Sequence, residues 1–335
     1  MKQQNTQSTV DCAATQPKSP SPFSPFGVDL FGEPIRPETT SPVAQKFIVP
    51  PFSVLSSRDG EWQDRKRAWT SLGIKSELGR ESGMTYMKGE DMPDYLKEKM
   101  GNSFVEGDSG TSIFDPVVCE LMYSWFSGKG AQVVDPFAGG SVRGIVASCL
   151  GRKYWGGELR GEQVEANRKQ GADLCPGDTD LKWEEGDSMK TLDDAPDADF
   201  VFSCPPYGDL EVYSDDPDDI SNMEYHTFKA AYGRIILKAV TRLKQDRFAC
   251  FVVGDFRDKK GFYRNFVSDT IAAFEAAGAR FYNEGILVTS VGSACMRVTR
   301  QFNAGRKFAK THQNILVFCK GDWKKATKAA TEGEI

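Results

Sequence analysis

From about residue 106 onward, short apolar runs alternate with longer amphipathic stretches. The apolar runs that we expect to form buried strands are 131–134, 154–158, 182–184, 200–203, 248–253, 281–288 and 314–319. The stretches with helical periodicity are 115–125, 142–150, 162–170, 223–243 (with Ser221 as its expected N-cap) and 266–277. Such alternation is typical of an α/β fold with a mostly parallel sheet covered by helices.

The same pattern divides the chain into four segments. Residues 1–45 are rich in Gln, Ser, Thr and Pro, a composition that buries too little apolar surface to offset its ordering entropy. We therefore expect a disordered arm there, followed by an N-terminal extension at 46–105. The alternating domain covers 106–322. The Lys-, Ala- and Thr-rich tail at 323–335 is expected to be flexible and frayed.

A predicted helix in the extension carries Trp62 and Trp69 on one face, with the basic run 65–67 between them. Aromatic residues at helical spacing usually pack against a core. We therefore favour an interpretation in which the tryptophans dock the helix on the main domain while the charges are solvated. The alternative is a basic and aromatic surface for nucleic acid.

Two short motifs follow predicted strands of the main domain. The first runs from Asp135 to Gly140, and the second is Cys204-Pro205-Pro206-Tyr207. In a parallel α/β sheet, ligands bind in the crevice beyond the carboxyl ends of the strands. Both motifs should therefore open onto one crevice.

The first motif is suited to a nucleoside-containing cofactor. Its glycines let a ligand approach the backbone, and the following helix offers free amides, although the turn lacks the Gly-x-Gly-x-x-Gly spacing and alone also fits a plain tight turn. Glu158 closes the next strand roughly 20 residues later, where an acidic residue commonly hydrogen-bonds ribose. Asp187 closes a third strand and could accept a hydrogen bond from an adenine amino group.

Acidic residues in the pocket would repel a phosphate-rich ligand, so S-adenosyl-L-methionine fits better: it offers ribose and adenine groups and a cationic sulfonium. The residues that we expect to bind it are Asp135, Phe137, Ala138, Gly139, Gly140, Glu158, Asp187, Ser188, Ser112 and Asp115.

The second motif is suited to an amino group on a planar base. Proline fixes φ and removes amide donors, which leaves carbonyl oxygens as acceptors. Two acceptors that hold the N–H hydrogens favour a pyramidal nitrogen, whose lone pair can then attack a methyl group. Tyr207 can stack on the base. The predicted catalytic residues are Cys204, Pro205, Pro206 and Tyr207.

These motifs resemble the amino-directed (N6-adenine or N4-cytosine) DNA methyltransferases, and the stretch 114–320 is similar to their phage and prophage members. Supporting segments are 207–214 and 311–318, and 46–67 resembles the leader of such phage domains. The resemblance implies a Rossmann-like class I methyltransferase fold, with a mostly parallel seven-stranded sheet and an antiparallel last strand. It also implies a role in DNA methylation of the restriction-modification type.

Cys204 departs from the family pattern, which usually has Asp, Asn or Ser before Pro-Pro. A thiol is a weak acceptor, so the Cys204 and Pro205 backbone carbonyls or Ser203 would have to supply oxygens. A minor alternative is that Cys204 acts as a nucleophile in cytosine C5 methylation.

Access to a base in double-stranded DNA requires base flipping. The stretch 290–310, expected to be a loop between the last two strands, is basic with Phe302 and Phe308 interleaved. The predicted DNA-binding residues are Arg297, Arg300, Arg306, Lys307 and Lys310. The basic stretch 257–264 is a second candidate, whereas the acidic stretch 209–219 should face away from DNA or act as a lid.

Composition constrains the function only loosely. A net charge of −5 neither favours nor excludes DNA binding, because affinity depends on where the basic groups lie. Eight scattered cysteines and two histidines argue against disulfides, a metal site or a His-based triad. No apolar run is long enough for a membrane span. We expect a cytoplasmic protein, in a bacterial host cell if it is phage-encoded.

The predicted function is site-specific S-adenosylmethionine-dependent methylation of an exocyclic amine in DNA, with adenine N6 preferred. The alternatives are cytosine N4 or C5 methylation, RNA base methylation, and a catalytically inactive nucleic-acid-binding relative. The recognition sequence and the oligomeric state stay open.

Overall fold

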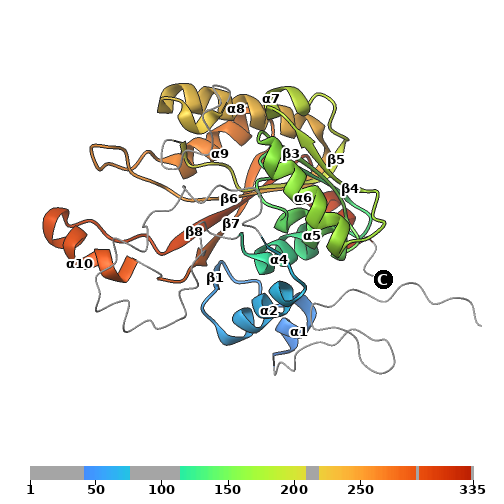
Figure 1. Cartoon of the computed structure of the whole chain (residues 1–335), viewed down its shortest axis with the longest axis horizontal. Helices are drawn as coiled ribbons and strands as arrows, with labels where there is room; N and C mark the ends of the chain where they lie inside the picture. Colours follow the sequence, from blue (N-terminus) through green and yellow to red (C-terminus); the bar gives the residue numbers. More distant parts are fainter. Residues whose placement is uncertain (1–40, 76–113, 209–218, 292–293, 333–335) are drawn as a thin grey trace, which may run out of the picture.

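The computed structural model describes residues 41–75, 114–208, 219–291 and 294–332 (Figure 1). The strands are β1 (Val54–Ser56), β2 (Gln132–Asp135), β3 (Lys153–Glu158), β4 (Leu181–Glu185), β5 (Ala198–Ser203), β6 (Leu243–Val253), β7 (Arg280–Val288) and β8 (His312–Lys320). The helices are α1 (Pro42–Phe47), α2 (Gly60–Ser71), α4 (Pro116–Phe126), α5 (Val142–Cys149), α6 (Gly161–Leu174), α7 (Ser188–Thr191), the 3₁₀ turn η4 (Ile220–Asn222), α8 (Tyr225–Arg242), α9 (Phe266–Ala276), α10 (Ala294–Gly305) and α11 (Trp323–Thr331).

The eight described strands form one sheet in the order β1-β7-β8-β6-β5-β2-β3-β4. Every neighbouring pair is parallel except the two pairs made by β8, which runs antiparallel to β6 and to β7. The expected Rossmann-like, mostly parallel sheet with an antiparallel last strand is therefore confirmed. The strand number differs from seven, because β1 of the N-terminal extension pairs with β7 and adds an eighth.

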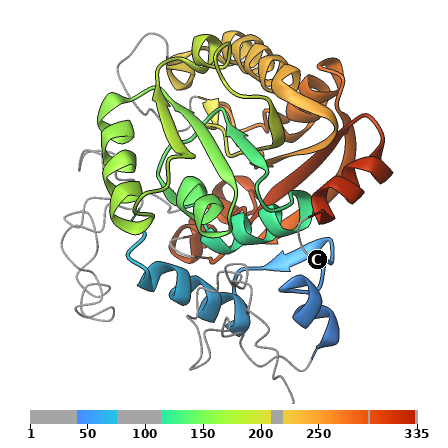
Figure 2. The ribbon, with the colours of Figure 1, turned by 90° about the vertical axis from the view of Figure 1, so that its right-hand side faces the viewer.

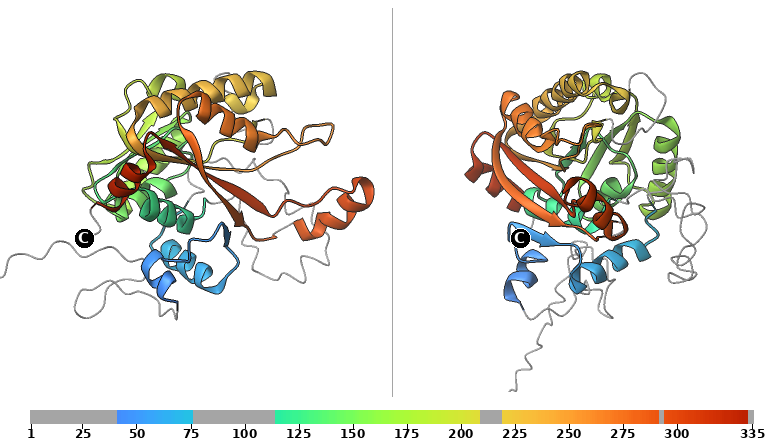
Figure 3. Two further views of the ribbon diagram at one scale, coloured as in Figure 1. Left: turned by 180° about the vertical axis from the view of Figure 1, so that it is seen from behind. Right: turned by 90° about the vertical axis from the view of Figure 1, so that its left-hand side faces the viewer.

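Helices cover both faces of this sheet (Figures 2 and 3). One core contains buried residues of α2, α4, α5 and α11 against one face, and the other contains buried residues of α8 and α9 against the opposite face. Strands β2 and β5 are buried on both faces, as central parallel strands require. Within the described residues no helix has the length and apolar character needed to cross a membrane.

Two segments at the end of the chain form helices that the sequence pattern did not predict. The stretch expected to be a loop between the last two strands contains α10, and the stretch expected to be a frayed tail contains α11. Asp322 caps α11 by accepting hydrogen bonds from the amides of Lys324 and Lys325, and Ala326 and Ala330 are buried. The expectation for α11 was wrong because a few apolar positions on a Lys-rich helix are enough for docking, whereas α10 forms a helix that stays largely exposed.

The predicted N-cap of the long helix was also wrong. Ser221 lies within the preceding 3₁₀ turn, where its amide and its hydroxyl both donate to the carboxylate of Asp219. Helix α8 begins at Tyr225, with Glu224 as its N-cap residue.

Helix α2 docks on α4 through its tryptophans, as we predicted, but the expectation that the whole basic run is solvated was wrong, because Arg65 is held in an ion pair with Glu120. Trp62 and Trp69 are 3% and 0% exposed. The indole Nε1 of Trp69 donates to Glu120 Oε2 at 2.9 Å, and Arg65 donates to both Glu120 oxygens at 2.8 and 2.6 Å. Because Glu120 is itself only 3% exposed, this buried ion pair holds the N-terminal extension on the main domain.

We expect Glu120→Ala to lower the free energy of unfolding by about 3–5 kcal/mol, because it removes the buried carboxylate to which the Arg65 guanidinium and the Trp69 indole both donate. Asp64→Ala removes the exposed ion-pair partner of Arg67 and is the matched control, with an expected effect of less than about 1 kcal/mol. Urea denaturation of both variants measures the difference. Equal effects would mean that the Glu120 hydrogen bonds do not anchor α2.

Candidate active site at the carboxyl ends of the strands

The two motifs lie side by side at the carboxyl ends of β2 and β5. Ser203, the last residue of β5, donates a hydrogen bond from Oγ to Asp135 Oδ1 at 2.5 Å, and the Phe137 amide donates to Ser203 Oγ at 3.2 Å. The neighbouring turn after β4 joins them, because Ser188 Oγ donates to the Pro136 carbonyl at 2.5 Å. The sheet therefore brings together three segments that are well separated in the sequence.

Asp135 is the buried centre of this edge, with 0% exposure. Its Oδ2 accepts from Arg143 Nε at 2.6 Å and from the Tyr154 hydroxyl at 2.8 Å. Its Oδ1 accepts from the Phe137 amide at 3.1 Å as well as from Ser203. The carboxylate is thus surrounded by four protein donors, so it organises the turn rather than facing a ligand.

Arg143 ties the turn after β2 to helix α5. Its Nη2 donates to the carbonyls of Phe137 and Ala138 at 2.5 and 2.8 Å, and its guanidinium lies 4.7 Å from the centre of the Phe114 ring. Burial disfavours the charged form, but the adjacent Asp135 carboxylate outweighs it, so the pKa of Arg143 is raised. Arg143 was not identified from the sequence, where an arginine in the first turn of a helix is indistinguishable from a surface residue.

Gly139 leaves open space above the turn. Its φ is +52°, and no atom of the described chain lies within 4 Å of the position that a Cβ would occupy. Its amide donates to Glu158 Oε2 at 2.9 Å, and its carbonyl accepts from Asn167 Nδ2 at 2.7 Å. Glu158 also accepts the Arg160 amide at 3.0 Å through Oε1. A half-buried carboxylate therefore lies beside an accessible glycine backbone.

The remaining acidic candidates have structural partners. Asp187 caps the short helix α7 by accepting the Met189 amide at 2.8 Å. Asp115 caps α4 through the Val117 amide at 3.0 Å, and its other oxygen accepts from Trp62 Nε1 at 3.2 Å. Asp187 lies at the edge with the two motifs. Ser112 lies outside the described residues, as does the predicted acidic lid except Asp219.

The Pro-Pro-Tyr turn presents Tyr207 from an aromatic cluster. The Tyr207 ring packs edge-on against Phe266, with 6.0 Å between ring centres, and tilted against Phe256 at 6.2 Å. Its hydroxyl accepts a hydrogen bond from Gln313 Nε2 at 2.7 Å. Cys204 and Pro206 are half-buried, and Pro205 is buried. These neighbours fix Tyr207 from two elements, α9 and β8.

Strand β8 and the residues just before it supply three side chains to this edge that motif reasoning did not place there. Gln313 holds Tyr207, Lys310 Nζ lies 3.3 Å from His312 Nε2, and Lys310 also packs against Gly254 at the end of β6. The sequence carried one signal for them, the resemblance of 311–318 to the methyltransferase family. It gave no reason to pair Gln313 with Tyr207, because the two are 106 positions apart.

A basic and aromatic surface lies beyond Tyr207. The stretch 257–264 and the residues after α10 touch, since a side chain at Gly261 would collide with Lys307. Phe262 and Phe308 are 72% and 78% exposed. Arg257 stacks over the Tyr263 ring at 4.0 Å. The structure therefore joins the two basic segments that the sequence had offered as separate candidates.

The predicted DNA-binding residues fall on α10 and on the segment that follows it. Arg297 and Arg300 are on the helix, which projects from the ends of β7 and β8, and Arg300 is exposed (Figure 1). Arg306 is exposed and stacks over the Phe302 ring at 5.3 Å, Lys307 meets the 257–264 stretch, and Lys310 lies back toward Tyr207.

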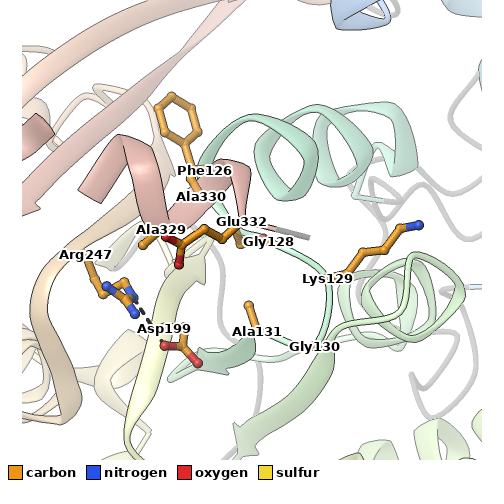
Figure 4. Close-up of a pocket in the computed structure, with 11 residues that line it drawn as sticks. Phe126, Gly128, Lys129, Gly130, Ala131, Asp199, Arg247, Ala329, Ala330 and Glu332 are labelled. Carbon is orange, nitrogen blue, oxygen red and sulfur yellow. Dashed lines mark hydrogen bonds and ion pairs between the residues drawn. The ribbon is translucent and has the colours of Figure 1, made fainter. Parts of the chain in front are cut away.

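A separate pocket of about 190 Å³ lies at the opposite edge of the sheet (Figure 4). It is bounded by residues before β2, the start of β5 and the end of α11. The Asp199 carboxylate in it already accepts hydrogen bonds from Lys244, Arg247 and the Gln132 amide. The Asp199 carboxylate in this pocket thus holds strand ends together. In the part of the chain that the structure covers, no cluster of His, Cys, Asp or Glu could hold a metal ion.

No protein-family model matches the chain, and no curated protein matches it in sequence. The similar solved structures include TrmN from Thermus thermophilus, with a TM-score of 0.42 and 15% identity over 62% of this chain and 49% of that chain. The chain thus spans about half the length of that protein.

Two further solved structures are similarly remote. The magnesium protoporphyrin IX methyltransferase ChlM from Synechocystis, solved with bound SAM, has a TM-score of 0.41 and 12% identity over 68% of this chain and 90% of that chain. A putative DNA modification methylase from Thermus thermophilus has a TM-score of 0.30 and 18% identity over 41% of this chain and 51% of that chain. These likenesses are too distant to identify a function, and the fold assignment rests on the strand order.

We expect Asp135→Asn to lower the free energy of unfolding by about 3 kcal/mol or more, because it leaves the buried Arg143 charge without its counter-charge. Asp187→Asn is the matched control and should change it by less than about 0.5 kcal/mol, since asparagine caps a helix as well as aspartate. Urea denaturation of the two variants tests this. A small effect of Asp135→Asn would show that the turn is held by other interactions.

Proposed function

We propose that this protein transfers a methyl group from S-adenosyl-L-methionine to the exocyclic amino group of a base in double-stranded DNA, most favourably adenine N6. The observation that carries the proposal is the juxtaposition of the Pro-Pro-Tyr turn with the glycine turn. Ser203 joins the two through hydrogen bonds to Asp135 and Phe137. The residues proposed to bind the cofactor and those proposed to bind the base therefore lie at one edge of the sheet, joined by hydrogen bonds.

The residues on the cofactor side fit the proposed cofactor. The open space above Gly139 admits a ligand to the backbone, and the Glu158 carboxylate beside it can accept ribose hydroxyls once its bond to the Gly139 amide is exchanged. Phe137, Ala138, Gly140, Asp187 and Ser188 complete the proposed binding site. When bound, S-adenosyl-L-methionine supplies a methyl group activated by a positively charged sulfur. Asp135 supports this site indirectly by fixing the turn.

On the base side the chain supplies acceptors and a stacking ring. The Cys204 and Pro205 carbonyls lie in a turn whose prolines have no amide donors, and in this proposal their oxygens accept the two amine hydrogens. Holding both hydrogens takes the nitrogen lone pair out of conjugation with the ring of the base. The lone pair then points at the methyl group of the cofactor. Tyr207, fixed by Phe266 and Gln313, offers its ring to the base. The expected rate gain comes from positioning and electrostatic stabilisation.

The basic and aromatic surface beyond Tyr207 supports DNA as the substrate. Arginines on α10 can bind phosphates, and the exposed rings of Phe262 and Phe308 can fill the gap left by a flipped base. The net charge of −5 does not oppose this, because affinity depends on the cations gathered at the site rather than on the sum over the chain.

The direct test is incubation of the purified protein with unmethylated duplex DNA and S-adenosyl-L-methionine, followed by mass spectrometry of the digested nucleosides. N6-methyladenine is the expected product, and N4-methylcytosine would change the target base within the same mechanism. 5-Methylcytosine would overturn the amine mechanism and make Cys204 the nucleophile. Methylation of RNA alone would overturn the DNA substrate.

The Gln313–Tyr207 hydrogen bond should contribute to turnover. Tyr207→Ala is expected to lower kcat by about 100-fold or more by removing the stacking ring, with little change in cofactor affinity. Tyr207→Phe and Gln313→Leu should each lower kcat about 5- to 10-fold, and the double variant should lose no more than either single variant. Independent, multiplying losses would show that Gln313 does not act through Tyr207.

Replacing Arg297, Arg300 and Arg306 together by Gln should weaken DNA binding and flatten its salt dependence. Each arginine that no longer neutralises a phosphate should reduce the log–log slope by up to about 0.9. The matched control replaces Lys324, Lys325 and Lys328 of α11, which removes the same charge from the exposed face of another helix. Titrations at several salt concentrations give both slopes. An unchanged slope for the α10 variant would place the DNA elsewhere.

A further inference from the structure

Lys310 is the basic residue of the 306–310 segment that lies toward Tyr207. Lys307 and Lys310 are half-buried, whereas Arg306 is exposed. A Cβ placed on Gly254 would lie 3.4 Å from Lys310 Cε and 3.9 Å from the Tyr207 hydroxyl, so the lysine and the tyrosine approach the same glycine. A side chain at Gly254 would therefore crowd both. Lys310 therefore lies beside Tyr207, within reach of an occupant of the proposed base site.

His312 orients Lys310. Burial lowers the pKa of His312, and the adjacent Lys310 lowers it further, while Asp255 acts in the opposite direction. The imidazole is consequently neutral near pH 7, and its Nε2 can accept a hydrogen bond from Lys310 Nζ, which lies 3.3 Å away. Burial also lowers the pKa of Lys310, again opposed by Asp255. One of the amine hydrogens of Lys310 is thus directed to His312, and the others remain for a second acceptor.

Lys310 adds a charged donor to the proposed base site. The Pro-Pro-Tyr turn offers carbonyl acceptors to the amine hydrogens, but the prolines have no N–H. In adenine and in cytosine the ring nitrogen next to the amine-bearing carbon is an acceptor, and burying it without a donor would cost free energy. A donor placed beside Tyr207 can therefore pair with that ring nitrogen in either base.

We propose that Lys310, oriented by His312, donates a hydrogen bond to the ring nitrogen adjacent to the target amine and thereby recognises the base that is methylated. This inference rests on the proposed function and names a specificity-determining residue for it. It assigns Lys310 to base recognition, in place of the phosphate binding expected from the sequence.

The test uses duplex DNA in which the target base is replaced by its deaza analogue, 1-deazaadenine or 3-deazacytosine, according to the base that mass spectrometry identifies. The analogue keeps the amine but replaces the neighbouring ring nitrogen by C–H. Wild-type protein should lose about 10- to 100-fold in kcat/KM on the analogue. Lys310→Met should lose a similar factor on normal DNA and nothing further on the analogue.

Further variants separate recognition from folding. Lys310→Arg and His312→Gln, which keep a donor and an acceptor, should retain most of the discrimination between normal and deaza DNA, whereas His312→Leu should lose most of it. Lys324→Met, on the exposed face of α11, is the matched control and should behave as wild type.

The outcomes separate the two proposals. If wild-type protein methylates DNA but the losses from Lys310→Met and from the analogue multiply, the proposed Lys310 hydrogen bond is wrong and the proposed function stands. If wild type discriminates poorly between the two DNAs, that hydrogen bond is also wrong. If wild type methylates no DNA at all, the proposed function itself fails.

Discussion

A carboxylate with no exposed surface, at the end of a central strand, is the constraint on which the site depends. Asp135 would cost several kcal/mol to bury as an isolated charge, and the cost is offset only because Arg143, Tyr154, Ser203 and the Phe137 amide all donate to it. Each of those donors belongs to a different part of the edge. Satisfying one buried charge therefore fixes the turn after β2, the first turn of α5 and the end of β5 relative to one another.

The position of the Pro-Pro-Tyr turn depends on that hydrogen-bond network and on the antiparallel strand β8. Ser203 precedes the Pro-Pro-Tyr turn directly, so its bond to Asp135 ties the turn to the glycine turn. Strand β8 runs opposite to its neighbours, so its first residues, rather than its last, lie at the carboxyl ends of the parallel strands. That reversal brings Gln313 and Lys310 to Tyr207 from the far end of the chain.

Local patterns predicted most of the fold and the position of both motifs. The central strands and helices were found to within a few residues, because a buried parallel strand is a continuous apolar run and the helices between them keep a clear period. Prediction failed for two polar helices, α10 and α11, which look like solvated, charged sequence and whose apolar positions are too few to stand out. The eighth strand of the sheet, β1, was missed because three residues are too few for a strand pattern to show.

The sequence by itself determined which segments end at the carboxyl edge of the sheet and which chemical groups they bring there: an aspartate with glycines, two further acids, and carbonyls before a tyrosine. Tertiary structure alone decided the role of each group. Asp135 is enclosed by donors from four segments, whereas Glu158 lies beside open space at Gly139. The physical reason is that burial and hydrogen-bond partners arise between elements distant along the chain, and residue identity and spacing do not record them.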